Sequence, residues 1–431
     1  MNTVTPSLNE PAKRPPLASR RNDFVPACKI AIVGFGTVGR AVGDILSRTP
    51  LPQLRLTHVL NRRVERKRVD WTPKSVNWTE DFEQVLASDA DIVVELIGGV
   101  DPAKEWIEKS LLAGKSVVTA NKRVMAEHGP ELLALARQMG QRLEYGGSVA
   151  GGVPVLCGLQ QGLAGDRVVR LSGVLNGTCN YILSNMEARG TSFSSALAKA
   201  QDLGFAEADP AEDIHGLDAR CKLTILSRLA FHTQVQPQQI PSRSISGIEA
   251  VDFDLAKQLG YTIRQVSTAE VDGNVLRAAV RPALVPLKSP LAQTRDNENA
   301  LIISGEHSGE TLFAGRGAGG GPTAVAVVSD LVAIAENRLP IQVAFAHHSY
   351  ELRSDFLLSH YLRLRSIDAP QVEAILRARQ FAIRSITSDA ANQAHVAIVL
   401  EPSSSSAVDD AVEAIRSTNS RLSLGPALPM F

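Results

Sequence analysis

Two lysines and the acids near them are the residues of this sequence best suited to chemistry on a small polar molecule. Lys122 follows an apolar segment, and Lys222 comes four residues after Asp218 in a segment with helical spacing. Residues at positions i and i+4 share one face of a helix. An ammonium group beside a carboxylate can donate a proton and stabilise negative charge that develops on a substrate oxygen. The alternatives are an exposed ion pair for Asp218 and Lys222, and a surface charge for Lys122.

A cluster of acids precedes that helical segment. Between Leu203 and Asp213 the chain carries four carboxylates, of which Glu207 and Asp213 are the candidates that we single out. Four carboxylates suit the ammonium group of a ligand or a metal ion, and they also offset the positive end of a helix dipole. The residues alone leave both uses open.

A glycine-rich turn supplies a second kind of site. Residues 29–33 are typical of a buried strand, and helical spacing follows from Arg40 to Leu46. In this context glycines let backbone N–H groups approach a pyrophosphate at the N-terminus of the helix. The alternative is a turn that only packs. We predict a dinucleotide-binding turn formed by Gly34, Phe35, Gly36, Thr37, Val38 and Gly39.

The segment after the next strand favours one form of the dinucleotide. A site selective for NAD places an acid about 20 residues after the glycines. Between Leu54 and Val64 there is no acid, and Arg62 and Arg63 stand there instead, followed by further basic residues. A guanidinium at that place would pair with a 2′-phosphate, which favours NADP, with NAD possible. The alternative is a solvated basic loop.

These candidate residues need elements that position them. Strands expected at 54–60, 91–97 and 116–120 alternate with helices, which predicts an α/β fold with a Rossmann-type, doubly wound parallel sheet. Asp101-Pro102 opens one helix and Gly114 closes it, and a further helix is expected to start at Pro154. The predicted domains are a disordered tail (1–25), a dinucleotide-binding domain (26–155, with 315–345 returning to it), a mixed α+β catalytic and dimerisation domain (156–314) and a C-terminal module (355–431).

The C-terminal module has the pattern strand–helix–strand–strand–helix, which is typical of a ferredoxin-like fold. Its strands are expected at 361–365 and 395–400, and its second helix runs from the serines at 403–406 to about Ser417. One face of so small a sheet must be covered, and a second copy in a dimer is the simplest cover.

Composition limits the classes of function. The chain has 431 residues, 44% hydrophobic and 21% charged, with 45 basic and 45 acidic residues. This balance favours neither a nucleic-acid binder nor a membrane-surface protein. No apolar run approaches the roughly 18 residues of a membrane-spanning helix. Four cysteines without a CxxC motif indicate a reducing compartment, the cytoplasm.

Taken together, the ordered motifs resemble those of homoserine dehydrogenase over roughly residues 28 to 335. The motifs that carry the resemblance are Gly34-Phe-Gly-Thr-Val-Gly39, Thr119-Ala-Asn-Lys122, Ser148-Val-Ala-Gly-Gly-Val-Pro154, Asn176-Gly-Thr-Cys-Asn-Tyr-Ile182, Glu207-Ala-Asp-Pro210, Gly216-Leu-Asp-Ala-Arg-Cys-Lys222 and Gly317-Ala-Gly-Gly320.

The resemblance implies reversible, NAD(P)-dependent interconversion of L-homoserine and L-aspartate 4-semialdehyde, on the route to threonine, isoleucine and methionine. It implies a homodimer or homotetramer. By the same resemblance the proton-transferring lysine is Lys222, the lysine between cofactor and substrate is Lys122, the substrate-binding glutamate is Glu207, acids lining the same pocket are Asp213 and Asp218, and a backbone position near the cofactor is Gly317.

Two departures from the family pattern matter. The family's monovalent-cation site has a glutamate where this chain has Gly146, so a sodium ion would have only the backbone carbonyls of Val149, Gly151 and Val153. The C-terminal module resembles the family's regulatory ACT domain only loosely. Its turn at 368–371 lacks the glycine expected after proline, which predicts weak threonine binding or none.

Two other functions remain compatible with the residues. One is a related NADP-linked reductase of another small oxo-acid, and the other is a catalytically silent NADP- or amino-acid-binding regulator. The presence of both Lys122 and Lys222 argues against the silent regulator. We interpret Cys179 and Cys221 as packing residues, because reducing an aldehyde requires no thiol nucleophile.

Overall fold

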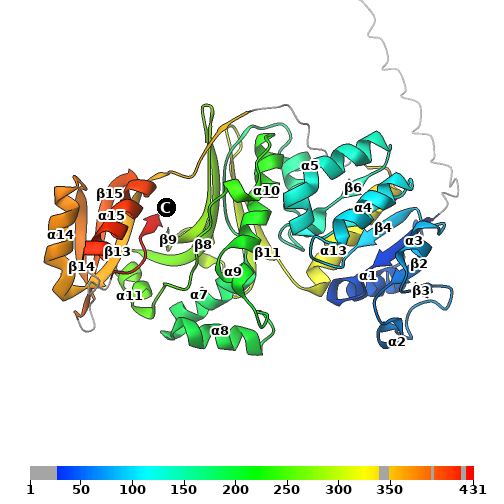
Figure 1. Cartoon of the computed structure of the whole chain (residues 1–431), viewed down its shortest axis with the longest axis horizontal. Coiled ribbons are helices and arrows are strands. Elements are labelled where there is room, and N and C mark those ends of the chain that lie inside the picture. Colours follow the sequence, from blue (N-terminus) through cyan, green and yellow to red (C-terminus); the bar gives the residue numbers. More distant parts are fainter. Residues whose placement is uncertain (1–26, 339–348, 390–392, 419–423) are drawn as a thin grey trace, which may run out of the picture.

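Three regions follow one another along the long axis of the molecule (Figure 1). The computed structural model describes residues 27–338, 349–389, 393–418 and 424–431. The predicted tail lies outside the described residues, as do residues 339–345 of the segment expected to return to the first domain.

The first region is a six-stranded parallel sheet. Its strand order, β3-β2-β1-β4-β5-β6, is that of a Rossmann fold and confirms the predicted class. The strands are β1 (Cys28–Val33), β2 (Leu54–Leu60), β3 (Asn77–Thr79), β4 (Ile92–Glu95), β5 (Ser116–Thr119) and β6 (Leu143–Glu144).

Helices cover both faces of this sheet, because each inner strand is apolar on both sides. Ile30 and Ile32 of β1 pack in the same cluster as residues of α1 and α13, whereas Ala31 and Val33 pack with α4 and α5. Although α13 comes late in the sequence, it lies against α1 (Figure 1). These helices are α1 (Thr37–Arg48), α2 (Val64–Lys67), α3 (Phe82–Leu86), α4 (Ala103–Leu112), α5 (Lys122–Gln138) and α13 (Gly320–Ala335).

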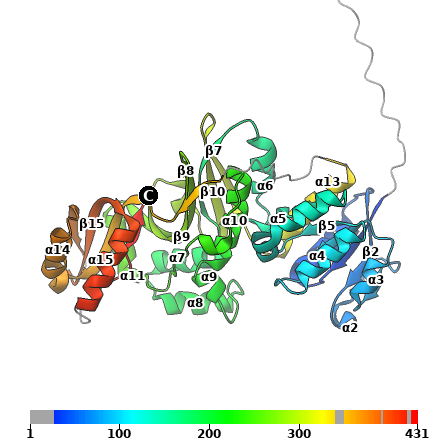
Figure 2. The ribbon, with the colours of Figure 1, turned by 45° about the horizontal axis from the view of Figure 1, so that its top comes forward.

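The middle region is a largely antiparallel part of a second sheet. Its strands, in the order β11-β10-β7-β8-β9, are β7 (Val168–Val174), β8 (Tyr261–Asp272), β9 (Val275–Pro286), β10 (Glu298–Gly305) and β11 (Gly309–Arg316). Helices α7 and α10 pack on one face, and α10 also lies beside α5 of the first region (Figure 2). The helices here are α7 (Gly177–Arg189), α8 (Phe193–Asp202), α9 (Ala211–Ile214), α10 (Leu217–Phe231), α11 (Ala250–Gln258) and α12 (Pro290–Gln293).

The helix expected from Pro154 is present and begins at Val155. It consists of α6 (Val155–Cys157) and a π-helical turn, Gly158–Gly162. A Cβ on Gly158 would lie 2.4 Å from the ring of Phe313, so glycine lets β11 pack close to this turn.

The C-terminal module has the predicted element order with one further strand at its end. Its elements are β13 (Leu357–Arg365), α14 (Ala369–Ala378), β14 (Ile383–Ser388), β15 (His395–Ser404), α15 (Ser405–Thr418) and β16 (Leu428–Met430). Strand β16 pairs with β9 of the middle region, and β12 (Glu351–Arg353) pairs with β9 as well. The module's sheet is therefore continuous with the middle sheet.

The module's sheet does not need a second copy to cover its open face, contrary to expectation, because both faces pack against other parts of the same chain. Helices α14 and α15 cover one face. On the other face Tyr361, Val399 and Leu428 pack in one cluster with Ile248 and Phe253 of the α11 region. The chain itself covers that face, because α11 lies between the two sheet segments.

Candidate active site

The glycine-rich turn leaves β1 and enters α1 with open space at its centre. Gly34 has φ +101°, and a Cβ there would lie 2.7 Å from the carbonyl carbon of Leu96. A Cβ on Gly39 would lie 2.0 Å from the carbonyl oxygen of Gly34, so these two glycines are required by the fold. A Cβ on Gly36 would meet nothing within 4 Å, and α1 has no side-chain cap. The turn thus fits a bound pyrophosphate, which would lie against Gly36 and accept from the uncapped N–H groups.

A cavity of about 410 Å³ adjoins this turn and is lined by cations. Its lining residues are Phe35, Gly36, Thr37, Arg40, Arg66, Lys67, Arg68 and Val69. Arg62 and Arg63 are exposed and do not line it. The chain turns at Arg63, which has φ +83° and donates its backbone N–H to Glu80, and this turn brings the later basic residues to the cavity.

A second cavity, of about 260 Å³, lies between the first and middle regions. It brings together residues that are far apart in the sequence. Val38 of the glycine turn, Lys122, Lys222 and Gly317 all line it, together with the buried acid Glu95. This cavity is therefore where a nicotinamide ring and a small substrate can meet.

Lys122 stands at the first position of α5, at the carboxyl edge of the parallel sheet. The Asn121 side chain accepts from the backbone N–H of Val124 at 3.2 Å, so the helix starts directly after β5. The same amide donates to the carbonyl of Gly99 at 2.6 Å. These contacts hold Lys122 where ligands bind to sheets of this type.

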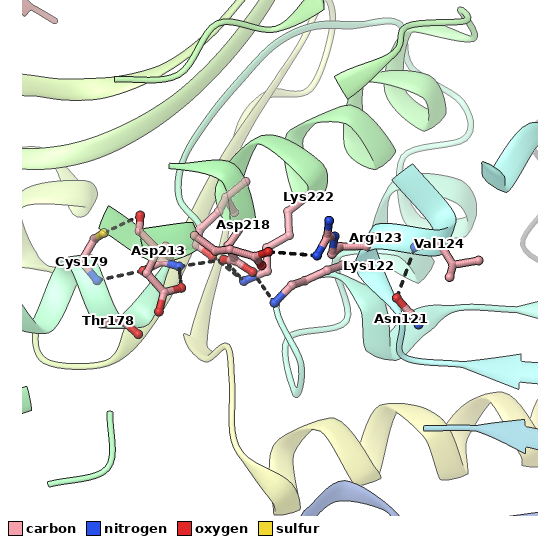
Figure 3. Close-up of polar contacts among 12 residues, drawn as sticks. Asn121, Lys122, Arg123, Val124, Thr178, Cys179, Asp213, Asp218 and Lys222 are labelled. Carbon is pink, nitrogen blue, oxygen red and sulfur yellow. Dashed lines mark hydrogen bonds and ion pairs between the residues drawn. The ribbon is translucent and has the colours of Figure 1, made fainter. Parts of the chain in front are cut away.

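Asp218 is the centre of a buried ion network that joins the two regions. Its Oδ1 lies 2.5 Å from Nζ of Lys122, and its Oδ2 lies 2.8 Å from Nζ of Lys222 (Figure 3). Lys222 also donates to the carbonyl of Leu175 at 2.9 Å. Asp218 and Lys222 are 3% and 7% exposed, so this pair is not the exposed ion pair that the sequence allowed.

Charge shapes the ionisation of this network. Burial by itself raises the pKa of Asp218, but the ammonium groups of Lys222 and Lys122 outweigh it and hold the pKa below its ordinary value. The carboxylate of Asp218 raises the pKa of Lys122 in return. Asp213 behaves oppositely, because burial and the nearby Asp218 raise its pKa. One acid is thus firmly ionised, and its neighbour gains a proton more readily.

Asn176 connects these two acids, although in the sequence it stands out only as part of the motif at 176–182. Its Oδ1 accepts from the backbone N–H of Cys179 at 2.8 Å and caps α7. That bond fixes the amide, whose Nδ2 donates to Asp213 at 2.6 Å and to Asp218 at 2.8 Å. An asparagine at the start of a helix that leads into the acid cluster was the signal that could have identified it.

Glu207 lies apart from this network. It is exposed in the loop between α8 and α9, and its carboxylate makes no hydrogen bond or ion pair with any described residue. Nearby, Arg123 pairs with Glu212 at 2.9 Å and bridges the two regions at the surface. Asp213 is half-buried and faces Asp218, so the structure brings together Asp213, Asp218 and the two lysines but not Glu207.

A carboxylate from α13 contacts the turn considered for a cation. Asp330 of α13 is 8% exposed, accepts from the backbone N–H of Gly146 at 2.7 Å, and would lie 2.7 Å from a Cβ at that position. Burial, and then the nearby Glu144, raise the pKa of Asp330 well above its ordinary value. Asp330 thus fills the space of the missing glutamate side chain. Within the described residues, no three His, Cys, Asp or Glu side chains are grouped to hold a metal ion.

The two cysteines near the site are buried and poorly reactive. Cys179 donates to the carbonyl of Asp213 at 3.1 Å, and burial raises its pKa well above the ordinary value. Burial raises the pKa of Cys221 as well. A thiolate is the reactive form of cysteine, so both residues act in packing.

Comparison with known proteins decides the family. Residues 34–146 match the model of the homoserine dehydrogenase NAD-binding domain, and residues 154–332 match that of homoserine dehydrogenase. The homoserine dehydrogenase of Bacillus subtilis is 40% identical over 358 residues, which cover 79% of this chain and 82% of the relative. This chain belongs to the homoserine dehydrogenase family.

Solved structures agree with this assignment. A homoserine dehydrogenase from Thiobacillus denitrificans superposes with a TM-score of 0.85 at 31% identity, covering 94% of this chain and 98% of its own. A hyperthermophilic archaeal homoserine dehydrogenase in complex with NADPH has a TM-score of 0.63 at 26% identity, covering 73% and 100%. The protein is therefore an NAD(P)-dependent oxidoreductase that interconverts L-homoserine and L-aspartate 4-semialdehyde.

No helix in the described part of the chain is long and apolar enough to cross a membrane.

Proposed function

We propose that Lys222 transfers the proton in the homoserine dehydrogenase reaction and that Asp218, which also pairs with Lys122, holds Lys222 in place. The bound nicotinamide supplies the hydride. The observation that carries this assignment is the meeting of Lys122 and Lys222, from two regions, on one buried carboxylate beside the cavity that contains Val38 and Gly317. An ammonium group has three N–H donors, and Lys222 uses two of them in hydrogen bonds to the carbonyl of Leu175 and to Asp218. The third is available to the substrate oxygen, whose negative charge it stabilises.

The acids bind the amino group of the substrate in this proposal. Asp218 already pairs with two lysines, which leaves Asp213 and Glu207 for the substrate ammonium. Because Glu207 is exposed and without a side-chain partner among the described residues, it contributes when its loop meets the substrate. Replacing it by Ala should raise KM for homoserine about tenfold and lower kcat less. An unchanged KM with a lower melting temperature would assign Glu207 a structural role instead.

We propose NADP as the preferred cofactor. The support is the basic lining of the cavity beside the glycine turn, from Arg40, Arg66, Lys67 and Arg68, in addition to the arginines at positions 62 and 63. The archaeal relative in complex with NADPH shows that the family fold accepts this cofactor. The test is the ratio of dissociation constants for the two cofactors at low ionic strength.

We extend the proposal to a monovalent cation such as sodium. Its ligands would be the backbone carbonyls of Val149, Gly151 and Val153, as the family resemblance implies. A melting temperature measured in sodium chloride and in choline chloride tests this directly. Equal values in both salts would remove the cation from the proposal.

The assembly and compartment are proposed as a homodimer or homotetramer in the cytoplasm. In support, Leu312 on the edge strand β11 is 49% exposed beside Ile302, and all four cysteines are unpaired thiols. Light scattering of the purified protein tests the assembly.

One assay distinguishes the activity from its alternatives. Oxidation of NADPH with aspartate 4-semialdehyde, followed by absorbance, should proceed, and other small oxo-acids should react poorly. A silent regulator would bind the cofactor without oxidising it, and a different reductase would prefer another oxo-acid.

A further inference from the structure

Arg228 is a buried cation outside the ion network. It lies near the end of α10, is 5% exposed and forms no ion pair with any acid in the described residues. Burial lowers its pKa to about 10, which still leaves it charged at neutral pH. A buried charge is costly unless polar groups compensate it. The partners of Arg228 therefore indicate what the charge does.

All four partners of Arg228 are neutral oxygens, and they come from both regions. In α5 it donates to the carbonyls of Met125 at 3.0 Å and Ala126 at 2.7 Å. Beyond α10 it donates to the carbonyl of Val235 at 2.9 Å and the side chain of Gln236 at 3.3 Å. One guanidinium thus connects the cofactor-binding region to the helix that carries Lys222.

Pro130 leaves one carbonyl of α5 without its hydrogen bond within the helix. In an α-helix the carbonyl of Ala126 would accept from the N–H of residue 130, and proline has none. Arg228 supplies the missing donor from the other region. The two residues are therefore matched across the boundary between the regions.

This contact is the second of two polar attachments between α5 and α10, which also pack through apolar side chains. The first is the ion pair of Lys122 with Asp218. Asp218 and Arg228 are ten residues apart on α10, which corresponds to about 15 Å along the helix. Two attachments at separated points fix the direction of a helix as well as its distance, and a single one does not.

We infer that Arg228 is a positioning residue that holds Lys222 in register with the cofactor-binding region. The inference rests on the proposed role of Lys222 in proton transfer. Hydride and proton reach the same carbonyl group from different regions of the chain. A change in the angle between α5 and α10 therefore alters their geometry without removing either group.

The test compares kcat with cofactor binding. Arg228→Met should lower kcat in both directions about 30-fold and change the dissociation constant of NADPH no more than about twofold, because the cofactor turn is untouched. Arg228→Lys should keep part of the kcat that Arg228→Met loses, because an ammonium can still donate to some of the four oxygens. The rescue should be incomplete, because an ammonium cannot reach all of them.

Pro130→Ala separates positioning from stability. Arg228→Met should also lower the melting temperature, because it leaves the carbonyl of Ala126 without a donor. Alanine at position 130 returns an N–H to that carbonyl, so the double variant should regain much of the melting temperature but not of kcat. Recovery of kcat together with melting temperature would overturn the inference, as would a near-normal kcat in Arg228→Met.

Arg264 is the control within a single region. It is also buried, but it pairs with Glu187 at 2.9 Å and donates to Thr262 and to the carbonyls of Ile263 and Ala292, all in the middle region. Arg264→Met should lower the melting temperature with kcat unchanged, and an equal loss of kcat would overturn the inference. If Lys222→Ala stays active, the proposed role of Lys222 fails; if it is inactive while Arg228→Met is active, only the inference about Arg228 fails.

Discussion

The two cavities of this enzyme are built in opposite ways. The cavity beside the glycine turn is formed within one region by residues 35–40 and 66–69, and its basic side chains are exposed. The ion network beside the second cavity joins Asp218 and Lys222 of α10, which are buried, to the partly exposed Lys122 of α5 and to Asn176, which caps α7. The first site presents solvent-exposed cations to an anionic ligand, whereas the second holds the Asp218 carboxylate and the Lys222 ammonium away from water.

The difference has a consequence for energetics. Exposed charges are screened by salt and each contributes little, whereas a buried group that loses its partner leaves an uncompensated charge. Substitutions in the buried network should therefore have large effects that depend weakly on salt. Substitutions in the basic loop should have small effects that fade as salt rises.

Lys222→Ala should produce the largest effect. It removes the proposed proton donor and leaves Asp218 with Lys122 alone, so kcat should fall by on the order of 10² to 10⁴. Steady-state rates in both directions, with NADPH binding measured separately, check this.

Lys115 provides the control for that variant. It is 6% exposed and donates to the carbonyls of Ser88 and Ala90 within the first region. Lys115→Ala should lower stability without lowering kcat. If Lys222→Ala keeps kcat near normal, the buried network is structural and the contrast between the two cavities disappears.

Asn176→Ser should produce the next largest effect, and it depends on pH. Serine can still cap α7 but is too short to bridge the two acids. The hydrogen bond from Asn176 lowers the pKa of Asp213, so its loss raises that pKa further. KM for homoserine should then rise about tenfold on the acid side and recover at higher pH, where Asp213 is ionised.

Asn176→Ala is the comparison that separates the two roles of this side chain. This variant loses the cap as well as the bridge, so its melting temperature should fall below that of Asn176→Ser. Its KM should depend on pH in the same way as the KM of Asn176→Ser, because both variants lack the bridge. A KM for Asn176→Ser that does not vary with pH would show that the bridge does not tune Asp213.

The basic loop should respond more weakly. Replacing Arg66, Lys67 and Arg68 together by Ala should weaken NADP binding several-fold and leave NAD binding nearly unchanged, with the difference shrinking as salt is added. The pair Arg62→Ala and Arg63→Ala is the matched control and should have the smaller effect. A larger effect from that pair would favour the sequence-based assignment, and equal losses for both cofactors would indicate general attraction of anions.

Threonine should have the smallest effect. Gln371 lies in the first turn of α14, at the place where a glycine would let a ligand approach the backbone. Titration of the intact enzyme with threonine should leave the rate unchanged in the sub-millimolar range. Inhibition there would show that this turn builds an effector site without the glycine.

The first region was the more predictable one, because its signals are local. The glycine turn, its strand and its helix lie within about 20 consecutive residues, and the expected strand at 54–60 coincides with β2. The lining of the cofactor cavity was less predictable, since the backbone of Arg63 turns away through a contact with Glu80, which is distant in sequence.

The sequence by itself determined the Rossmann-type fold and the residue types able to transfer a proton, because strand periodicity, glycine turns and helix spacing are local properties. Only the tertiary structure decided that Asp218 serves both Lys122 and Lys222, that Asn176 bridges two acids, and that α11 covers the C-terminal sheet. Burial is the physical reason. Whether a charge is solvated or held by a partner depends on segments up to hundreds of residues apart, and no local pattern encodes that.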